Sequence, residues 1–491
     1  MPTSATLIPF GEYRPDVADY EGQHTKNILN VLPRGDGYGP MASVTQLTQA
    51  LAATCRGSFV ARKNDGTVVI FAGTSTKLYK LSNTDYSWAD ASLGAGTYTA
   101  LNATEQWQFA QFGNNVIAVQ ANAAPQVYDI TGAGPFAALG GSPPQARYVS
   151  VVGRFLVLSG LNSTPYRVQW SGLNAITTWT SGITLSDSQD LPDGGFVRGV
   201  AGGEFGVIFQ DASIRRMTFI PGSTNPFQIE RIAQDDGIYA PYSLVKAGDK
   251  VFFCSPQGFK VIAGTGAPTQ IGRERVDRTF FADVDSGNLQ LFIGVADPNS
   301  SRVFWAYKSL SSGGSTFFDK GLCYDWVLDR WSPLTWTGEY LTNMMQPGMT
   351  LEGLDSISGS IDALPQSLDL YSTASLPQLA IIDSSHKIGF FTGSNLEATL
   401  ESSEHGAAPQ RIRVRGFRPI TDATGYYGLL SYRDLQSTAA STTTEVAVNS
   451  IGNIDVMRAT RYARGRIRIL ADTSWTYAIG VEPDVITEGL R

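Results

Sequence analysis

The chain has 491 residues, of which 42% are hydrophobic and only 16% are charged, with a formal net charge of −7. At this length at least two packed units are expected, because single hydrophobic cores rarely grow beyond about 250–300 residues. The acidic balance disfavours sequence-independent binding of nucleic acid, which requires Lys and Arg to neutralise phosphates. The 51 Gly, 24 Pro and 20 Tyr favour short strands joined by turns, so the expected class is all-β.

The three cysteines, Cys55, Cys254 and Cys323, are far apart and odd in number. They therefore predict neither a metal knuckle nor a disulfide framework, and we expect buried free thiols. The segment from Met1 to Tyr13 lacks a basic region followed by an apolar core, and no run of about 18 apolar residues occurs. We expect a protein that is made and kept soluble inside a cell.

Residues 1–56 contain turn signals but little periodicity, and we expect an N-terminal extended arm there. Arg34-Gly35-Asp36-Gly37 is one such signal, because Gly and Asp favour chain reversal. The apolar spacing between Val44 and Ala53 predicts one short helix.

A unit recurs over residues 57–345, in which one apolar strand reaches a turn and a second apolar strand leaves it. Four copies turn at glycines spaced by 40, 50 and 45 residues, namely Gly113, Gly153, Gly203 and Gly248. Two further copies turn at Asn64-Asp65-Gly66 and at Asp297-Pro298-Asn299, which is standard hairpin chemistry. Several units add a strand with an aromatic residue, at Tyr79, Tyr128, Trp170 and Trp326.

Several strands per unit of about 45 residues are typical of propeller blades, which bury their faces only against neighbouring blades. We therefore predict a β-propeller of about six or seven blades over residues 57–345. A β-sandwich or an irregular β-solenoid is the alternative, because its strands are similarly spaced. No WD or Kelch signature fixes the blade count.

The sequence pattern changes over residues 346–491, where we expect a C-terminal β platform or a final blade with additions. The stretch LEGLDSISGSIDALPQSLD is loop-like, and the strands after it alternate strictly. Arg411-Ile412-Arg413-Val414-Arg415 places guanidinium groups on one face and apolar groups on the other, the pattern of a half-exposed strand.

Arginine is concentrated near the C-terminus. Residues 405–491 contain 11 Arg, no Lys and 8 Asp or Glu, so this segment carries +3 and the rest of the chain −10. Five of these arginines crowd one segment: Arg458, Arg461, Arg464, Arg466 and Arg468. They indicate either a docking surface for an acidic partner or nucleic acid, or the solvated face of a sheet.

Three loops carry acidic residues that could form a site. Asp187, Asp190 and Asp193 could supply oxygen ligands to Ca²⁺, but their spacing is not DxDxDG and a solvated turn is expected. Asp235-Asp236-Gly237 is likewise a turn signal. Asp325 and Asp329 flank a tryptophan, where acids more often cap a turn or pair with Arg330 than form a catalytic pair.

The sequence contains only partial matches to known catalytic motifs. Lys63 to Phe71 lacks the Ser and the aromatic spacing of an Asp-box, and Gly264 lies in a turn rather than a phosphate cradle. His24, His386 and His405 lie outside GxSxG and HExxH contexts, and we expect surface or loop histidines. We therefore predict no enzymatic activity, no cofactor and no metal.

Six short segments of the sequence, which we call phrases, resemble segments of a known group of proteins. They are IPFGEYRPDVADYEGQHTKNILNVLPRGDGYGP, WSGLNAITTW, QDLPDGGFVRGV, RVDRTFFADVD, CYDWVLDRWSPL and WTYAIGVEPDVITEGLR. They resemble tail proteins of double-stranded DNA bacteriophages, in particular the tail nozzle, or packaged-DNA stabilisation (tail hub), proteins of short-tailed phages. Related reading frames also occur in long-tailed phages and in prophage-derived particles.

The resemblance implies a β-propeller with a β platform, assembled as a homo-oligomeric ring, a homohexamer, below the portal and adaptor. Such a ring extends the DNA channel, retains packaged DNA until ejection and anchors tail fibres or spikes. Phage DNA would pass through its lumen without sequence-specific binding. The implied place is the virion, after assembly in the host cytoplasm, with only indirect contact with the host membrane.

Two other hypotheses remain open from the residues alone. The aromatic richness and the Asp-rich loops favour a phage-encoded propeller that binds or hydrolyses host surface glycan. The arginine-rich segment favours a DNA contact at the channel.

Overall fold

The computed structural model describes residues 7–18, 20, 22–314, 316–348, 354–355, 358–363, 376–406 and 409–487. The all-β prediction is confirmed, since α1 (Asp277–Asp283) and a few short 3-10 turns are the helical elements of this described part. The loop expected from Leu351 falls mostly outside the described residues, apart from Leu354–Asp355 and a 3-10 turn at Ile361–Ala363.

Seven four-stranded antiparallel sheets follow one another within the described residues. The first contains β8 (Ser58–Arg62), β9 (Val68–Gly73), β10 (Leu78–Leu81) and β11 (Trp88–Asp90), and the second β12 (Gln108–Phe112), β13 (Asn115–Gln120), β14 (Ala123–Asp129) and β15 (Ala137–Ala138). The third contains β16 (Ala146–Val152), β17 (Phe155–Leu161), β18 (Arg167–Trp170) and β19 (Asp187–Asp190), and the fourth β20 (Val197–Ala201), β21 (Gly206–Gln210), β22 (Ser213–Phe219) and β23 (Phe227–Gln234). The fifth contains β24 (Val245–Ala247), β25 (Lys250–Ser255), β26 (Gly258–Ala263) and β27 (Thr269–Gln270), and the sixth β28 (Ile293–Ala296), β29 (Arg302–Tyr307), β30 (Lys320–Asp325) and β31 (Arg330–Leu334). The seventh contains β32 (Gly338–Met344), β33 (Gln378–Asp383), β34 (Ile388–Phe390) and β7 (Thr45–Gln46).

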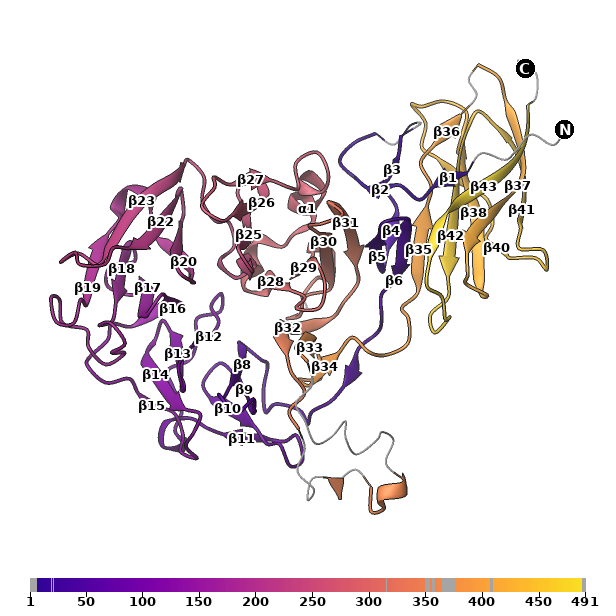
Figure 1. Ribbon diagram of the computed structural model, residues 1–491. Coiled ribbons are helices and arrows are strands. Elements are labelled where there is room, and N and C mark those ends of the chain that lie inside the picture. The colour runs from indigo at the N-terminus through magenta and orange to yellow at the C-terminus, as the bar shows by residue number, and fades with distance from the viewer. Residues whose placement is uncertain are drawn as a thin grey trace.

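These sheets form a closed ring, which is the β-propeller architecture. A hydrophobic cluster fills each gap between successive sheets, and another joins the seventh sheet to the first, where Ile382 and Phe390 pack with Ile70. Most first strands of neighbouring sheets also touch, including β32 with β8 (Figure 1). Each sheet thus buries its two faces against its neighbours.

The repeating unit predicted from the sequence is confirmed at the level of its hairpins. All six predicted turns lie between the first and second strands of a sheet, and Gly113, Gly153 and Gly248 adopt φ of 58°, 57° and 61° there. Glycine reaches this left-handed region without the steric cost that Cβ imposes. Of the aromatic markers, Tyr79, Tyr128 and Trp170 lie in third strands, whereas Trp326 follows β30 in a turn.

The seventh sheet is assembled from distant segments. Its outer strand β7 comes from the N-terminal segment and pairs with β34, with Gln46 opposite Gly389. The helix predicted between Val44 and Ala53 is therefore wrong, because pairing with β34 supplies the backbone partners that a local pattern cannot reveal. The sheet also crosses the expected boundary at residue 345, since β32 precedes it and β33 follows it.

A β-sandwich lies beside the ring (Figure 1). One sheet contains β41 (Ile454–Thr460), β37 (Ile412–Thr421), β43 (Ala478–Thr487), β6 (Gly37–Pro40), β5 (Val31–Arg34) and β1 (Ile8–Pro9). The other contains β39 (Ser441–Thr442), β38 (Tyr426–Arg433), β42 (Tyr462–Ile469), β35 (Ala398–Glu401), β4 (Ile28–Leu29), β36 (His405–Gly406) and β40 (Val446–Ala447). Phe417, Ile467 and Val481 are among the buried residues between them.

The N-terminal arm is built into both parts of the molecule. Its strands β1, β5 and β6 join one sheet of the sandwich, β4 joins the other, and β7 joins the ring. Two further strands, β2 (Glu12–Tyr13) and β3 (His24–Thr25), pair with each other in parallel. The arm therefore ties the sandwich to the propeller through strand pairing.

Candidate functional site

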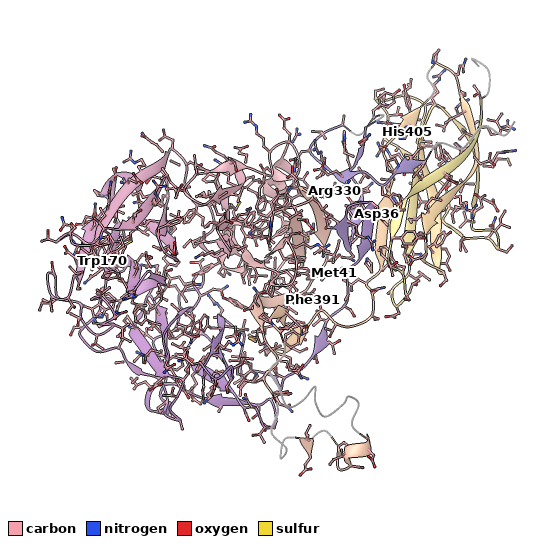
Figure 2. The ribbon with its side chains drawn as sticks, viewed as in Figure 1. Asp36, Met41, Trp170, Arg330, Phe391 and His405 are labelled. Carbon is pink, nitrogen blue, oxygen red and sulfur yellow. The ribbon has the colours of Figure 1, made fainter. Side chains whose placement is uncertain are left out.

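Four of the six phrases that resemble tail proteins meet where the propeller joins the sandwich. They contain the arm strands, α1, the β30–β31 hairpin and β43. β1 pairs with β43, and β4 and β5 lie against β31, where the Arg330 guanidinium donates to the carbonyl of Arg34 at 3.0 Å. Figure 2 shows Arg330 and Asp36 at this junction, whereas Trp170, in one of the other two phrases, lies across the ring. The junction is therefore the candidate functional site.

One asparagine connects all three parts at the junction. Asn30 Oδ1 accepts a hydrogen bond from the backbone N–H of Thr335 at 2.8 Å, and the Asn30 N–H donates to Pro333 O at 3.1 Å. Its Nδ2 donates to the carbonyl of Glu397 in the sandwich at 3.0 Å. Asn30 adopts φ of 57°, a conformation that asparagine tolerates better than most residues.

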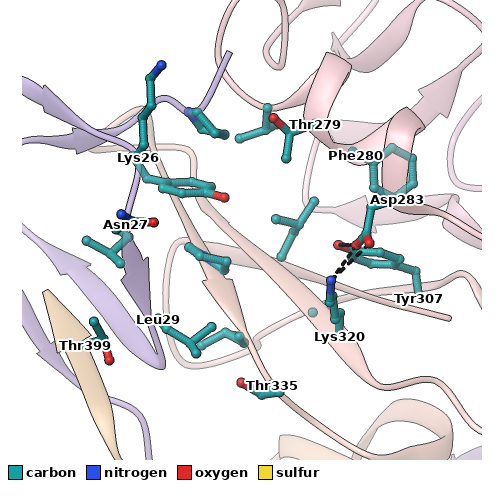
Figure 3. Close-up of a pocket in the computed structure, with 18 of the residues that line it drawn as sticks. Lys26, Asn27, Leu29, Thr279, Phe280, Asp283, Tyr307, Lys320, Thr335 and Thr399 are labelled. Carbon is teal, nitrogen blue, oxygen red and sulfur yellow. Dashed lines mark hydrogen bonds and ion pairs between the residues drawn. The ribbon is translucent and has the colours of Figure 1, made fainter. Parts of the chain in front are cut away.

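A cavity of 530 Å³ lies in the junction (Figure 3). Arm, propeller and sandwich all contribute to its walls, which are largely apolar and include Ile28, Leu29, Phe280, Leu322 and Leu334. Its volume lies within the range of about 300–1,000 Å³ that is usual for small-ligand sites, which also favour such boundaries between parts.

One wall of the cavity is polar. The Asp283 carboxylate accepts hydrogen bonds from the Tyr307 hydroxyl at 3.0 Å and from Lys320 Nζ at 2.8 Å (Figure 3). Burial, followed by the charge of Asp283, raises the pKa of Tyr307 above its usual value. The phenol therefore remains a donor at neutral pH, and the cavity suits an apolar group with a hydrogen-bonding head.

The axis of the ring is nearly filled. A hollow of 200 Å³ is lined by inner-strand and neighbouring residues, including Tyr148, Tyr242 and Tyr340. Burial raises the pKa of Tyr148 to about 12, so these side chains line the axis as neutral phenols. The hollow is smaller than an ordinary small-ligand pocket of about 300 Å³. DNA cannot thread the propeller itself.

The solvated turn expected for the three acids is wrong for Asp187 and Asp190, which lie in β19 because that segment pairs with β18, whereas Asp193 lies in a 3-10 turn. Their carboxylates do not converge on one point. Asp187 accepts from Ser181 Oγ at 2.8 Å, and Asp190 forms a two-pronged ion pair with Arg167. Asp193 pairs with Arg215 at 2.5 Å. Within the described residues no three His, Cys, Asp or Glu side chains are grouped to hold a metal ion.

The two acids around Trp326 act separately. Asp325 is 3% exposed, and its Oδ1 accepts from the backbone N–H groups of Val327 and Leu328, both at 3.1 Å, so it caps the turn as predicted. Asp329 pairs with Arg275 at 2.6 Å rather than with Arg330. The Arg330 partner proposed from the sequence is thus wrong, since Arg330 reaches the arm instead.

The three histidines occupy different settings. His24 lies in β3 with Nε2 2.5 Å from the carbonyl of Ala18, and His405 lies in β36 with Nε2 2.9 Å from Ser403 Oγ. His386 lies in the turn between β33 and β34, where Nδ1 is 2.5 Å from Glu339 Oε1. All three are partly exposed, so the surface or loop position expected for them is confirmed, although His24 and His405 lie in strands.

The cysteines are buried and unpaired, as predicted. Burial raises the pKa of the Cys323 thiol to about 12, and it raises the pKa of Cys55 and Cys254 as well. Since the thiolate is the reactive form, these side chains are inert packing groups at neutral pH.

The arginine-rich segment is largely neutralised by three glutamates that lie just before it. Arg468 pairs with Glu397 at 2.8 Å and Arg466 with Glu401 at 3.1 Å. Glu404 pairs with Arg433 at 2.6 Å. Residues 397–491 contain as many Asp and Glu as Arg, so the formal charge of this segment is zero. Most of these arginines therefore form internal ion pairs or lie on the solvated face of a sheet, and they do not form an open basic patch.

The buried acids of these networks were missed by the sequence analysis. Glu339, Glu401 and Glu404 are at most 1% exposed, yet their sequence surroundings give no motif. Their partners are distant, as in Arg466, which lies 65 residues from Glu401. Strand alternation gave no signal for two of them, since Glu401 is out of phase with the buried Ala398 and Leu400 and Glu404 lies outside β35.

Comparisons with known proteins found no matching protein family and no matching curated protein. Among solved structures, the chain is similar to the dihydro-heme d1 dehydrogenase NirN in complex with DHE, with 14% identity over 62% of this chain and a TM-score of 0.33. It is also similar to the extracellular domain of the putative hybrid two component system BT4673 from B. thetaiotaomicron, with 12% identity over 82% of this chain and a TM-score of 0.40. A third is BamB from Moraxella catarrhalis, with 11% identity, a TM-score of 0.31, and 62% of this chain and 92% of that chain covered. The match spans 61% of the NirN chain and 47% of the BT4673 chain, less than two thirds of either. No helix in the described part of the chain is long and apolar enough to span a membrane.

Proposed function

We propose that this chain is a non-enzymatic structural subunit of a bacteriophage virion, a tail nozzle or tail hub protein. In this proposal the seven four-stranded sheets are the blades of a seven-bladed propeller, and the sandwich is its platform. Six copies form a ring below the portal and adaptor. The ring extends the DNA channel, retains packaged DNA and anchors tail fibres or spikes.

The observation that carries the proposal is the arm. One N-terminal segment supplies β1, β4, β5 and β6 to the sandwich and β7 to the ring. The two parts cannot separate without breaking the hydrogen bonds of Asn30 and Arg330 and the packing of β4 and β5 on β31. The subunit is therefore stiff at the junction where most of the tail-like phrases meet. Stiff subunits suit the large permanent interfaces of an assembled particle.

The charge pattern supports the same role. The chain carries −7 overall, and its most arginine-rich part is internally neutralised. A lumen of this character lets DNA slide, because few phosphates are neutralised and little counterion release holds the DNA in place. Since the propeller axis is nearly filled, the DNA channel of this proposal runs between subunits.

The test is to locate and count the protein in particles. Negative-stain microscopy and light scattering of the purified chain should show rings with a multiple of the 52.9 kDa subunit mass. Mass spectrometry of separated phage tails should find the chain in the tail fraction. A strictly monomeric protein that is absent from tails would contradict the proposal.

The glycan hypothesis predicts a different result. Incubation with host surface polysaccharide would release sugar, and Asp187→Ala or Asp325→Ala would abolish the release. We expect no release, because the structure uses Asp187 and Asp325 to accept hydrogen bonds from Ser181 and from turn amides.

A further inference from the structure

Asp277, the first residue of α1, is a buried acid held in a glycine cradle. It is 8% exposed, and its Oδ1 accepts a hydrogen bond from the Phe259 N–H at 3.0 Å. A Cβ at Gly258, where φ is 122°, or at Gly272 would lie 2.0 Å from a carboxylate oxygen of Asp277. Asp277 Oδ2 is buried and has no hydrogen-bond partner among the described residues. The local chain is thus shaped to admit this carboxyl group but leaves one oxygen unsatisfied.

The arm places a second carboxylate at the same turn. Asp16 accepts hydrogen bonds from the backbone N–H groups of Arg278 and Thr279 at 2.8 and 2.9 Å, and from Thr279 Oγ1 at 2.7 Å. The Asp16 N–H donates to Arg275 O at 3.2 Å. Because Arg278 and Thr279 directly follow Asp277, the arm is attached to α1 beside the buried acid.

Few of the neighbouring charges can neutralise Asp277. Lys260 is 4% exposed, but its Nζ is bound to Asp236 Oδ2 at 2.7 Å and to Gln257 Oε1 at 3.0 Å. The titratable and charged groups that face Asp277 from the arm, the fifth sheet and the α1 segment are Asp16, Asp236, Cys254, Lys260, Arg273, Glu274 and Arg278. Burial is the main cause that raises the pKa of Asp277 to about 6; the Phe259 N–H lowers it, the charge of Asp16 raises it, and the charge of Lys260 lowers it.

We propose that Asp277 is a proton-controlled latch for the arm. With the Asp277 carboxyl protonated, the arm around Asp16 stays seated on α1. When Asp277 ionises, its charge repels Asp16 and the segment opens locally, while the strand pairings on either side hold. The seating of the arm on α1 thereby depends on pH, whatever the biological role of the chain.

The direction of the pH dependence follows from the raised pKa of Asp277. A carboxyl with a native value near 6 and an ordinary value of 3.8 binds more protons in the native state between these values. The latch is therefore fully closed at low pH, and its stability is lost as pH rises through about 6.

Hydrogen exchange of the full chain tests the latch. Peptides that cover residues 14–18 and the start of α1 should exchange faster at pH 8 than at pH 5 after correction for intrinsic rates, by about three- to tenfold. Asp277→Asn keeps an acceptor for the Phe259 N–H but cannot ionise, so its arm should stay protected at both pH values. Equal protection of the wild-type arm at both pH values, or a pH response that persists in Asp277→Asn, would overturn the proposal.

Two further variants keep the test decisive. Asp16→Asn retains an oxygen acceptor but removes the like charge, so it should reduce the pH response even where Asp277→Asn folds poorly. Asp329→Asn changes another junction acid, which pairs with Arg275, and should leave the pH response of the arm in place. A response lost equally in all three variants would show a general weakening of the junction and would reject the latch.

Discussion

The contact between the first and seventh sheets closes the propeller ring, and we call it the seam. One histidine stabilises it. Glu339 is 0% exposed, its Oε1 is 2.5 Å from His386 Nδ1, and its Oε2 accepts from the Cys55 N–H at 2.7 Å. Since Cys55 precedes the first sheet and Glu339 and His386 belong to the seventh, the network links the two ends of the ring. Removing one partner of a buried pair costs about 3–5 kcal/mol. We expect about 3 kcal/mol for His386→Gly, because the imidazole is 31% exposed.

Glycine is the informative replacement because His386 adopts φ of 63°, which glycine reaches without strain. His386→Asn is the matched control, since asparagine also tolerates this conformation and can present a neutral N–H near the position of Nδ1. We expect it to lose about 1 kcal/mol, the value of an ordinary hydrogen bond. Hydrogen exchange of seam peptides over residues 47–55 and 380–390 measures both losses.

The pH dependence of this loss separates electrostatics from packing. Burial raises the pKa of Glu339, while the Cys55 N–H and His386 lower it. Without His386 the pKa rises further, so the native state binds more protons and gains stability as pH falls. Because only a protonated imidazole makes an ion pair with Glu339, the defect of His386→Gly should be largest where the imidazole is protonated and the carboxyl is ionised, and it should shrink at higher and at lower pH. A loss that does not change with pH, or equal losses in the Gly and Asn variants, would refute the reasoning.

Two further variants test the networks at the junction and in the sandwich. Glu404→Ala should destabilise the sandwich by about 3–5 kcal/mol in denaturant unfolding, because Arg433 and Arg464 lose a buried acid partner; a loss below about 1 kcal/mol would show that the buried pair is dispensable. Asn30→Ala should cost about 2–3 kcal/mol, since Thr335 loses its acceptor and alanine is strained at φ of 57°. Faster exchange of β31 peptides would verify that loss, and an unchanged rate would argue against it.

The repeating hairpins could be predicted because their signals are local. Gly113, Gly153 and Gly248 mark turns whose conformation requires little more than their own residues. The seventh sheet could not be predicted in this way. Its first two strands are separated by residues 345–377, and its fourth strand comes from Thr45–Gln46. Pairing between distant segments depends on the closed ring, which no window of sequence contains.

The candidate site was predictable only in part, for a similar reason. The sequence analysis correctly predicted that Asp325 caps a turn, because an acid caps amides two and three residues later. It could not find Glu339 or Asp277, whose partners come from other sheets or from the arm. The burial that raises the pKa of these acids is a property of the assembled ring.

The arginines show how a local charge count can mislead about partners. Residues 405–491 carry +3, but Glu397, Glu401 and Glu404 lie just outside this window and face its arginines. Binding to DNA requires guanidinium groups that are free to displace counterions, and an internal ion pair must first be broken. We therefore expect no binding of the full chain to duplex DNA in fluorescence anisotropy at about 0.15 M salt. Micromolar binding that weakens steeply with salt, and that Arg418→Ala with Arg458→Ala abolishes, would show that the exposed arginines act as a DNA contact after all.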